Sequence, residues 1–332
     1  MKKVLLILMC CMAIQSVHAQ DTPKWADKAK KAVFSIVTYD KENKIKNTGN
    51  GFYIDNNGTA LSDYSLFEDA ERAVIINADG KELPVTRIAG ANSMYDVIKF
   101  RTETEKKITA LKVATQPAAV GETVYLLPYS TQKAATCQTG KVTQVDTIAD
   151  KAYYYTLTMT TSDKTVSCPI MNANGEVLGL IQKSASEEDK ESYAIGASYG
   201  ESLSISPLSA NDINLNKIGI AKALPETEDQ ALVYLYMSSS QMDAKNYLAT
   251  LNDFLQAYPN STEGYTRRAG YYMNIGDDEH NALAEADLKK AMDVSGNKTE
   301  GQYNVAKIIY SYCINLEEGK KAYGEPGVTT KH

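Results

Sequence analysis

The most informative part of the sequence is residues 165–181, Thr-Val-Ser-Cys-Pro-Ile-Met-Asn-Ala-Asn-Gly-Glu-Val-Leu-Gly-Leu-Ile. An apolar triplet begins at Pro169, Asn174-Gly175 follows, and an apolar run extends from Val177 to Ile181. Asn-Gly between two apolar runs is a strong signal for a two-residue hairpin turn, and the second run is typical of a buried strand. These residues therefore predict a β-hairpin.

This hairpin resembles the region around the nucleophile of trypsin-like serine proteases, especially the HtrA/DegP type. In that family Gly-Asn-Ser-Gly-Gly-Pro-Leu precedes a strand, an Asn-Gly or Asp-Gly turn and a second strand. The sequence from Pro169 onward fits this pattern. Counting back from Pro169, the two glycines fall on Ser167 and Cys168, and the catalytic serine falls on Val166. The resemblance implies a trypsin-like fold that lacks its nucleophile.

A second segment, residues 48–65, is similar to the part of these proteases that ends in the catalytic histidine. The family has Gly-Ser-Gly-Phe, a strand, an Asp-x-x-Gly turn, a strand and Thr-Asn-x-His, and this chain follows that order without a gap. The match places the histidine on Ser65, which cannot accept a proton near neutral pH. Residues 90–100 match the Asp-Leu-Ala-Val-Leu strand and place the triad aspartate on Asp96. The resemblance thus implies a degenerate triad of Ser65, Asp96 and Val166.

Histidine content supports the same conclusion. The chain has three histidines, none of them between residues 21 and 208: His18, His280 and His332. Serine and cysteine nucleophiles are usually activated by an adjacent base, most often histidine. Without that base we expect Asp96 to satisfy backbone donors in its turn. A shift of one residue in the match would make Ser167 the nucleophile, and this alternative stays open with a lysine or tyrosine as its base.

Short runs rich in Val, Ile, Thr and Tyr recur between residues 33 and 206 and are separated by Gly, Asn and Pro. A spacing of about 8 to 12 residues predicts an all-β barrel or sandwich. The resemblance narrows this to the double β-barrel of the trypsin-like fold. Cys137 and Cys168 lie in this half of the chain and are a possible disulfide in an oxidising compartment. The equal alternative is that both are small buried apolar residues.

Residues 1–20 have the pattern of a secretory signal peptide: two early lysines, an apolar run and the small-residue site Val17-His18-Ala19. We therefore expect an exported protein, periplasmic or extracellular. No later stretch has the roughly 18 to 20 apolar residues of a transmembrane helix. Loss of two lysines with the signal moves the formal net charge from -6 to about -8, which disfavours nucleic-acid binding. We expect no cofactor or metal, since His280 beside acidic residues is better explained as a helix start.

From Asp229 the apolar spacing becomes helical. Four positions recur at an offset of 37 residues: Tyr247, Leu251, Phe254 and Pro259 match Ala284, Leu288, Ala291 and Gly296. This spacing resembles tetratricopeptide repeats, whose usual period is about 34. Two further triplets are matched, Tyr265, Ala269 and Tyr272 with Tyr303, Lys307 and Tyr310. The alternative is an unrelated helical bundle.

Five tyrosines of this tail are candidates for a peptide-binding surface: Tyr234, Tyr265, Tyr272, Tyr303 and Tyr310. Tyrosines at helical spacing are more often half-buried packing residues, and we favour packing for them. The predicted organisation is a signal peptide (1–20), a trypsin-like (pseudo)protease domain (21–208), a linker (209–228) and a tetratricopeptide-like domain (229–332).

The sequence supports three hypotheses of function. The first is a catalytically inactive protease homologue that binds polypeptides or scaffolds an envelope complex, with a protein or peptide as its partner. The second is an active serine endopeptidase that uses Ser167 with a base other than histidine. The third is a structural module that contacts protein partners through its helices alone.

Overall fold

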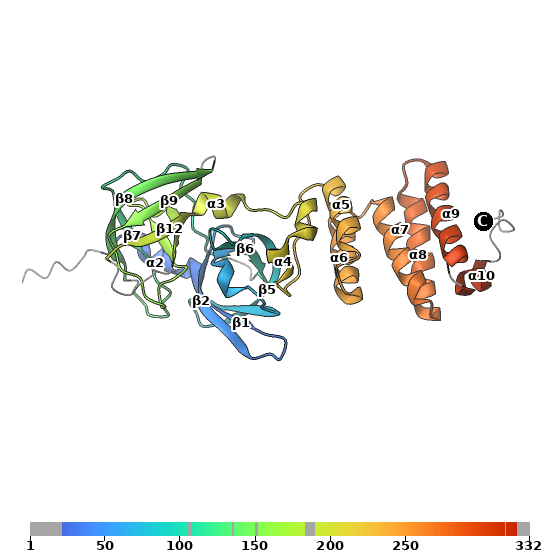
Figure 1. Ribbon diagram of the computed structural model, residues 1–332, viewed down its shortest axis with the longest axis horizontal. Helices are drawn as coiled ribbons and strands as arrows, with labels where there is room; N and C mark the ends of the chain where they lie inside the picture. Colours follow the sequence, from blue (N-terminus) through green and yellow to red (C-terminus); the bar gives the residue numbers. More distant parts are fainter. Residues whose placement is uncertain are drawn as a thin grey trace, which may run out of the picture.

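The computed structural model describes residues 22–104, 108–134, 136–149, 152–182, 190–315 and 317–323. The predicted signal peptide lies outside these residues. Two closed β-barrels of six strands each are followed by a helical region, and Figure 1 shows the three parts in a row along the long axis. The predicted order of a double β-barrel and then helices is confirmed.

The first barrel is built around phenylalanine. Phe34, Phe52 and Phe100 are fully buried inside it, and the rings of Phe34 and Phe100 meet edge to face at 6.2 Å between centroids. Its antiparallel strands follow the order β1-β2-β3-β6-β5-β4 around the barrel. They are β1 (Val33–Tyr39), β2 (Ile45–Tyr53), β3 (Thr59–Ser62), β4 (Arg72–Ile76), β5 (Glu82–Asn92) and β6 (Val97–Thr102). A 3-10 turn, η2 (Tyr64–Leu66), follows β3.

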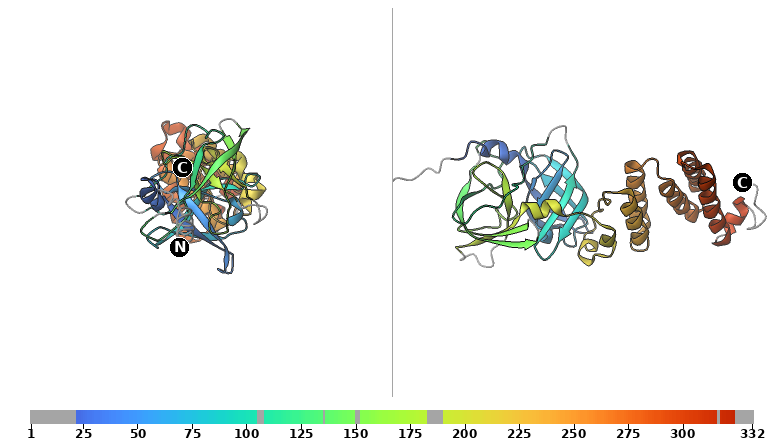
Figure 2. Two further views of the ribbon diagram at one scale, coloured as in Figure 1. Left: turned by 90° about the vertical axis from the view of Figure 1, so that its left-hand side faces the viewer. Right: turned by 90° about the horizontal axis from the view of Figure 1, so that it is seen from above.

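The second barrel has the order β10-β11-β12-β9-β8-β7 and a core of aliphatic side chains, which includes Val124, Leu157 and Leu180. Its strands are β7 (Thr123–Leu126), β8 (Gln138–Ala149), β9 (Ala152–Leu157), β10 (Pro169–Met171), β11 (Val177–Ile181) and β12 (Ser192–Gly196). Figure 2 shows the two barrels side by side when the molecule is seen from above.

The hairpin of residues 165–181 forms as β10 and β11, but its predicted two-residue turn is wrong. Such a turn of the Asn-Gly type needs positive φ at both central residues, and here Gly175 alone has it, at 77°. The loop is longer because the side chain of Asn172 accepts hydrogen bonds from the backbone N–H groups of Asn174 (3.0 Å) and Glu176 (2.9 Å). These side-chain hydrogen bonds stabilise a loop of three residues. A bulge follows in the pairing of β10 with β11.

A short N-terminal segment covers this turn. It consists of α2 (Ala26–Ala29) and the 3-10 helix η1 (Lys30–Ala32), and the indole N–H of Trp25 donates to the carbonyl of Ala173 at 3.0 Å. The Trp25 ring also meets the Tyr125 ring edge to face at 5.8 Å. A Cβ on Gly175 would lie 2.7 Å from the indole, so glycine is required there for close packing as well as for its φ.

After β12 the chain passes back along the first barrel through α3 (Ala197–Ser202), η3 (Pro207–Asn211) and α4 (Ile213–Asn216). The following extended residues then pair with β5. The N–H of Ile88 donates to Ala221 at 2.8 Å, and the N–H of Ala223 donates to Ile88 at 2.7 Å. The predicted linker is therefore attached to the first barrel over part of its length.

The helical region begins with α5 (Glu228–Ser238) and α6 (Ala244–Ala257), which share one apolar cluster. A second cluster joins α7 (Thr262–Ile275), α8 (Asp278–Val294) and α9 (Lys298–Asn315), and α10 (Glu317–Tyr323) follows. Side chains cap the first helices by accepting from backbone N–H groups: Thr227, Asp243, Ser261 and Asp277. No helix in the described part of the chain is both long and apolar enough to cross a membrane.

Candidate functional site

Ser65 and Asp96, the positions matched to the histidine and aspartate of a protease triad, lie in direct contact. Ser65 belongs to η2, and Asp96 lies in the turn between β5 and β6. The backbone N–H of Ser65 donates to Asp96 Oδ1 at 2.7 Å, and its hydroxyl donates to Oδ2 at 3.0 Å. Asp96 thus satisfies a backbone donor. The pair lacks a group that accepts a proton near neutral pH as an imidazole does.

In the turn that should hold the nucleophile, residues 162–168, three consecutive backbone N–H groups donate to carbonyls of the turn or of β11. Val166 donates to Ser162 at 3.2 Å, Ser167 donates to Ile181 at 2.8 Å, and Cys168 donates to Thr165 at 3.1 Å. An oxyanion hole requires N–H groups that point at the developing charge. These three groups have carbonyl partners instead, and so are not available to a substrate in this conformation.

Asn50 of β2 holds the same turn from the first barrel. Its side-chain amide donates to the carbonyls of Lys164 at 3.1 Å and Val166 at 2.9 Å, across the boundary between the barrels. Asn50 is itself 5% exposed, and its carbonyl accepts from the Ser62 hydroxyl at 2.6 Å. Sequence reasoning missed this role. The signal available was a polar residue between Gly49 and Gly51 in a segment that becomes buried.

Ser167, the alternative nucleophile, is fully buried and has a left-handed backbone with φ of 63°. Its hydroxyl has no hydrogen-bond partner of good geometry among the described residues. Left-handed φ is unfavourable for serine and natural for glycine. The conformation therefore agrees with the match that places a family glycine on Ser167, and it leaves the hydroxyl without a lysine or tyrosine base.

Asp63 lies beside Ser167 and was not predicted as a site residue. Its carboxyl is buried, and Oδ1 has no hydrogen-bond partner of good geometry among the described residues. Burial raises its pKa well above the usual value, and the charge of Asp96 raises it further, whereas the nearby Ser167 hydroxyl lowers it. A buried carboxyl in this position is held most easily in its neutral form.

The possible disulfide does not form in the structure, where Cys137 and Cys168 are free thiols. Cys168 is fully buried in the turn near Asp63, and burial raises its pKa to about 12. Cys137 is half-buried near Asp27 of the N-terminal segment, and burial raises its pKa to about 11. Their surroundings are different, and both thiols are unreactive in the protonated form.

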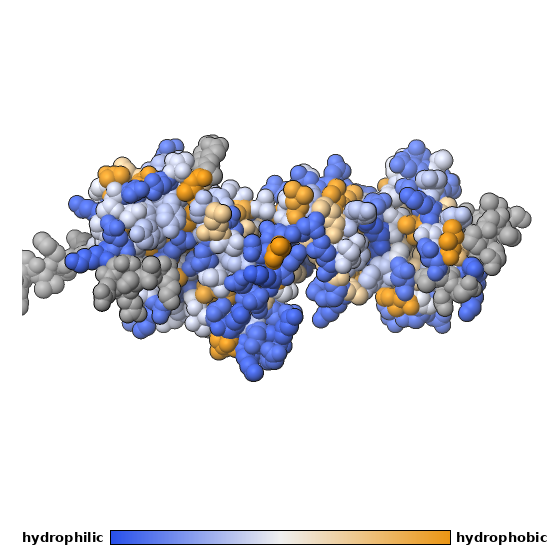
Figure 3. All heavy atoms as spheres, viewed as in Figure 1, coloured by the Kyte–Doolittle hydropathy of each residue, from blue (hydrophilic) through white to orange (hydrophobic). Residues whose placement is uncertain are grey.

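The five tyrosines that are candidates for a peptide-binding surface, and for which packing is favoured, do not share one surface. Tyr234 and Tyr272 are 2% and 9% exposed and pack in two different clusters, so for them the surface role is wrong. Tyr265 is half-buried and donates to the carbonyl of Pro259 at 3.1 Å. Tyr303 and Tyr310 on α9 are 68% and 56% exposed. Figure 3 shows a mostly hydrophilic face with hydrophobic residues in small separate groups.

No group of His, Cys, Asp and Glu among the described residues has the arrangement of a metal site. His280 lies at the start of α8, where its backbone N–H donates to Asp277 Oδ1 at 2.8 Å. The imidazole Nδ1 lies 2.7 Å from the same oxygen. The residue is therefore part of the cap of α8.

Comparison with known proteins shows what part of the barrels is similar to. Residues 49–180 match the family model of the trypsin-like peptidase domain. The chain is similar to the crystal structure of the serine endoprotease from Yersinia pestis, at 15% identity and a TM-score of 0.45, and the match covers 52% of this chain and 61% of that one. The search of curated proteins found no match. The two six-stranded barrels and the match over residues 49–180 give this chain the trypsin-like protease fold.

Proposed function

We propose that this chain is an exported trypsin-like protein without protease activity, which binds polypeptide segments. The observation that carries the proposal is the hydrogen bonding of the turn at residues 162–168: the N–H groups of Val166, Ser167 and Cys168 have carbonyl partners within the fold, and Asn50 holds the carbonyls of Lys164 and Val166. Ser65 replaces the general base, and Val166 replaces the nucleophile. A protein of this fold can keep a surface for an extended chain after its chemistry is lost.

We assign the proposed domains to residues 21–208 and 229–332, with 209–228 between them. The helical part is proposed to be tetratricopeptide-like. Two features at an offset of 37 support this: Leu251 and Leu288 are both buried, and Gly264 and Gly301 both lie where a Cβ would be within 3 Å of a side chain before their helix. The matched triplets on α7 and α9 do not support it, because Tyr303 is exposed whereas its partner Tyr265 is half-buried.

The first test addresses activity. Purified protein is incubated with a fluorophosphonate serine probe and, separately, with casein, and the Ser167→Ala variant is treated in parallel. We expect neither labelling nor cleavage, because the Ser167 hydroxyl is buried and has no histidine, lysine or tyrosine as its base. Labelling that disappears in the Ser167→Ala variant would overturn the proposal and make the protein a serine hydrolase.

The second test addresses binding. Reduced, carboxymethylated casein labelled with fluorescein is titrated with the protein, and fluorescence anisotropy reports the complex. A parallel titration uses a double variant, Tyr303→Ser and Tyr310→Ser, on the exposed face of α9. Unchanged binding by the variant supports the barrel and linker as the binding surface. Complete loss supports the second candidate, binding through the helices alone, which the exposure of these two rings favours.

A further inference from the structure

A groove separates the first barrel from the segment that follows it. One hollow of about 260 Å³ lies between β6, the end of α3 and residues 223–226. A second hollow of about 660 Å³ lies between β5, the same residues and α6. The two share Arg101, Ala223, Leu224 and Glu226 in their walls, so they are neighbouring parts of one groove. This groove is distinct from the Ser65 and Asp96 pair.

Two cations line the smaller hollow. Lys99 and Arg101 are two residues apart on β6 and therefore project from the same face of the strand. Lys99 donates to the backbone carbonyl of Glu201 at 2.7 Å, and neither cation forms an ion pair with a carboxylate among the described residues. Burial lowers the pKa of Lys99, whereas the charge of Glu226 raises it.

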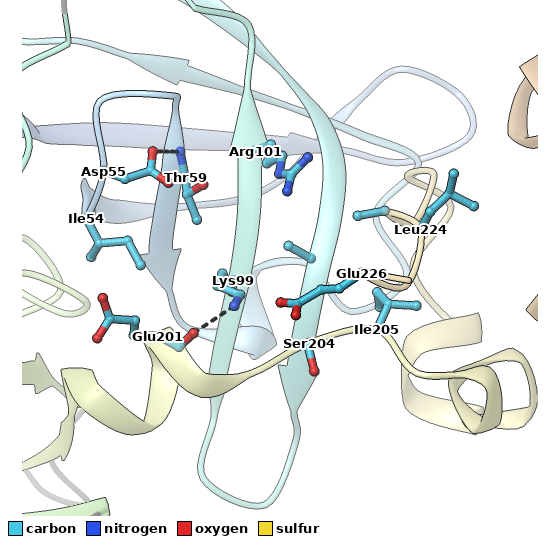
Figure 4. A pocket seen from close by; sticks show the side chains of 12 residues that line it. Ile54, Asp55, Thr59, Lys99, Arg101, Glu201, Ser204, Ile205, Leu224 and Glu226 are labelled. Carbon is cyan, nitrogen blue, oxygen red and sulfur yellow. Dashed lines mark hydrogen bonds between the residues drawn. The ribbon is translucent and has the colours of Figure 1, made fainter. Parts of the chain in front are cut away.

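The larger hollow has an apolar wall. Leu224 and Pro225 line it together with Ala257 and Tyr258 at the end of α6, and its lining also includes charged residues: Arg87, Arg101, Glu226 and Asp253. In the smaller hollow the carboxylate of Glu226 points toward Lys99, as Figure 4 shows. The groove thus combines an end that holds two cations and three acidic residues with an extension that is partly apolar.

We propose that this groove binds the C-terminal end of a polypeptide, with its carboxylate at Lys99 and Arg101 and apolar last residues along Leu224 and Tyr258. The proposal rests on the proposed function and names the site and the part of the polypeptide. A singly charged carboxylate suits the site better than a phosphate dianion, because Asp55, Glu201 and Glu226 also line the hollow and repel a second negative charge. The carboxylate of Glu226 points toward Lys99 in the free protein, so the ligand carboxylate has to compete with it.

The test uses a fluorescein-labelled pool of hexapeptides with apolar last residues, prepared with a free C-terminal carboxylate and as the C-terminal amide. Fluorescence anisotropy measures binding to the purified protein and three variants. We expect the free acid to bind about tenfold or more tighter than the amide. Lys99→Met and Arg101→Ala should abolish this preference, and Glu226→Gln should increase it.

Lys112→Met is the matched control, because Lys112 is an exposed lysine paired with Glu176 on the second barrel. It removes one positive charge that lines neither hollow, and should keep the preference for the acid. Thermal unfolding of each variant verifies that it is folded. Equal binding of acid and amide, or no binding of either at about 1 mM, would overturn the site. If the peptide test fails in this way but casein still binds to the Lys99→Met variant, the groove is not the binding site, and the proposed function of polypeptide binding still stands.

Discussion

Arg87 of β5 and Asp253 of α6 form an ion pair that joins the first barrel to the helical region. The guanidinium Nε donates to Asp253 Oδ2 at 2.8 Å, and a terminal nitrogen lies 2.5 Å from the same oxygen. Both side chains are 31% exposed. Both residues also line the larger hollow.

Arg87→Ala is expected to loosen the helices from the barrel with little effect on the stability of either. A partly exposed pair contributes about 1 kcal/mol or less to unfolding free energy. Its loss should instead widen the distribution of distances in small-angle X-ray scattering and speed proteolysis of residues 217–227. Lys112→Ala, which breaks an exposed pair within the second barrel, should change neither. A scattering profile identical to that of the parent would refute the expectation.

Asn50→Ala is expected to destabilise the protein by roughly 1 to 3 kcal/mol, because two part-buried carbonyls lose their donor. Urea unfolding measures this change, and hydrogen exchange should show faster exchange of the amides in residues 162–168. We expect no serine labelling in this variant, since Val166 still occupies the position of the nucleophile. Unchanged exchange in this turn would mean that Asn50 does not hold it.

Ser167→Gly is expected to stabilise the protein by about 1 kcal/mol. Glycine relieves the left-handed strain of a non-glycine residue, about 1 to 3 kcal/mol, and loses about 0.5 to 1 kcal/mol through its flexibility. It also removes a buried hydroxyl that lacks a partner of good geometry. Ser167→Ala keeps the strain and serves as the comparison in urea unfolding. A glycine variant that is less stable than the alanine variant would contradict the assignment of a family glycine position to Ser167.

Asp63→Asn is expected to be more stable than the parent at pH 7, with a difference that shrinks as the pH falls toward 4. The folded-state pKa of Asp63 is raised above the unfolded value, so the folded protein binds the proton more tightly. Its contribution to stability is therefore full below the unfolded pKa and is lost as the pH rises through the folded pKa. Asparagine stays neutral throughout. Urea unfolding at several pH values measures the difference, and a constant difference would exclude this explanation.

The strands could be predicted because they depend on a local pattern of apolar residues in the sequence. Val33–Tyr39 forms β1, in which buried side chains alternate with half-buried ones from Phe34 onward. The two strands of the hairpin also followed from composition. Its turn did not, since the side chain of Asn172 competes for the backbone donors that a two-residue turn leaves free.

The candidate site was predictable only where an ungapped match reached it. Ser65 and Asp96 were brought together by that match. Asn50 and Asp63 were missed, because their roles depend on contacts with residues more than 100 positions away, which no local pattern marks. The helical spacing of the tyrosines likewise does not predict that Tyr234 is buried in a core and that Tyr303 is exposed to solvent.

Because Trp25 contacts the hairpin turn, its fluorescence reports on the structure of that turn. The chain has one tryptophan and 22 tyrosines. Indole emission therefore originates from a single place, where the N-terminal segment covers β10 and β11 of the second barrel. Tyrosine emission and far-ultraviolet circular dichroism sample the other parts as well. Selective excitation of the indole follows the opening of this one turn, and comparison with circular dichroism separates the second barrel from the helices during denaturation.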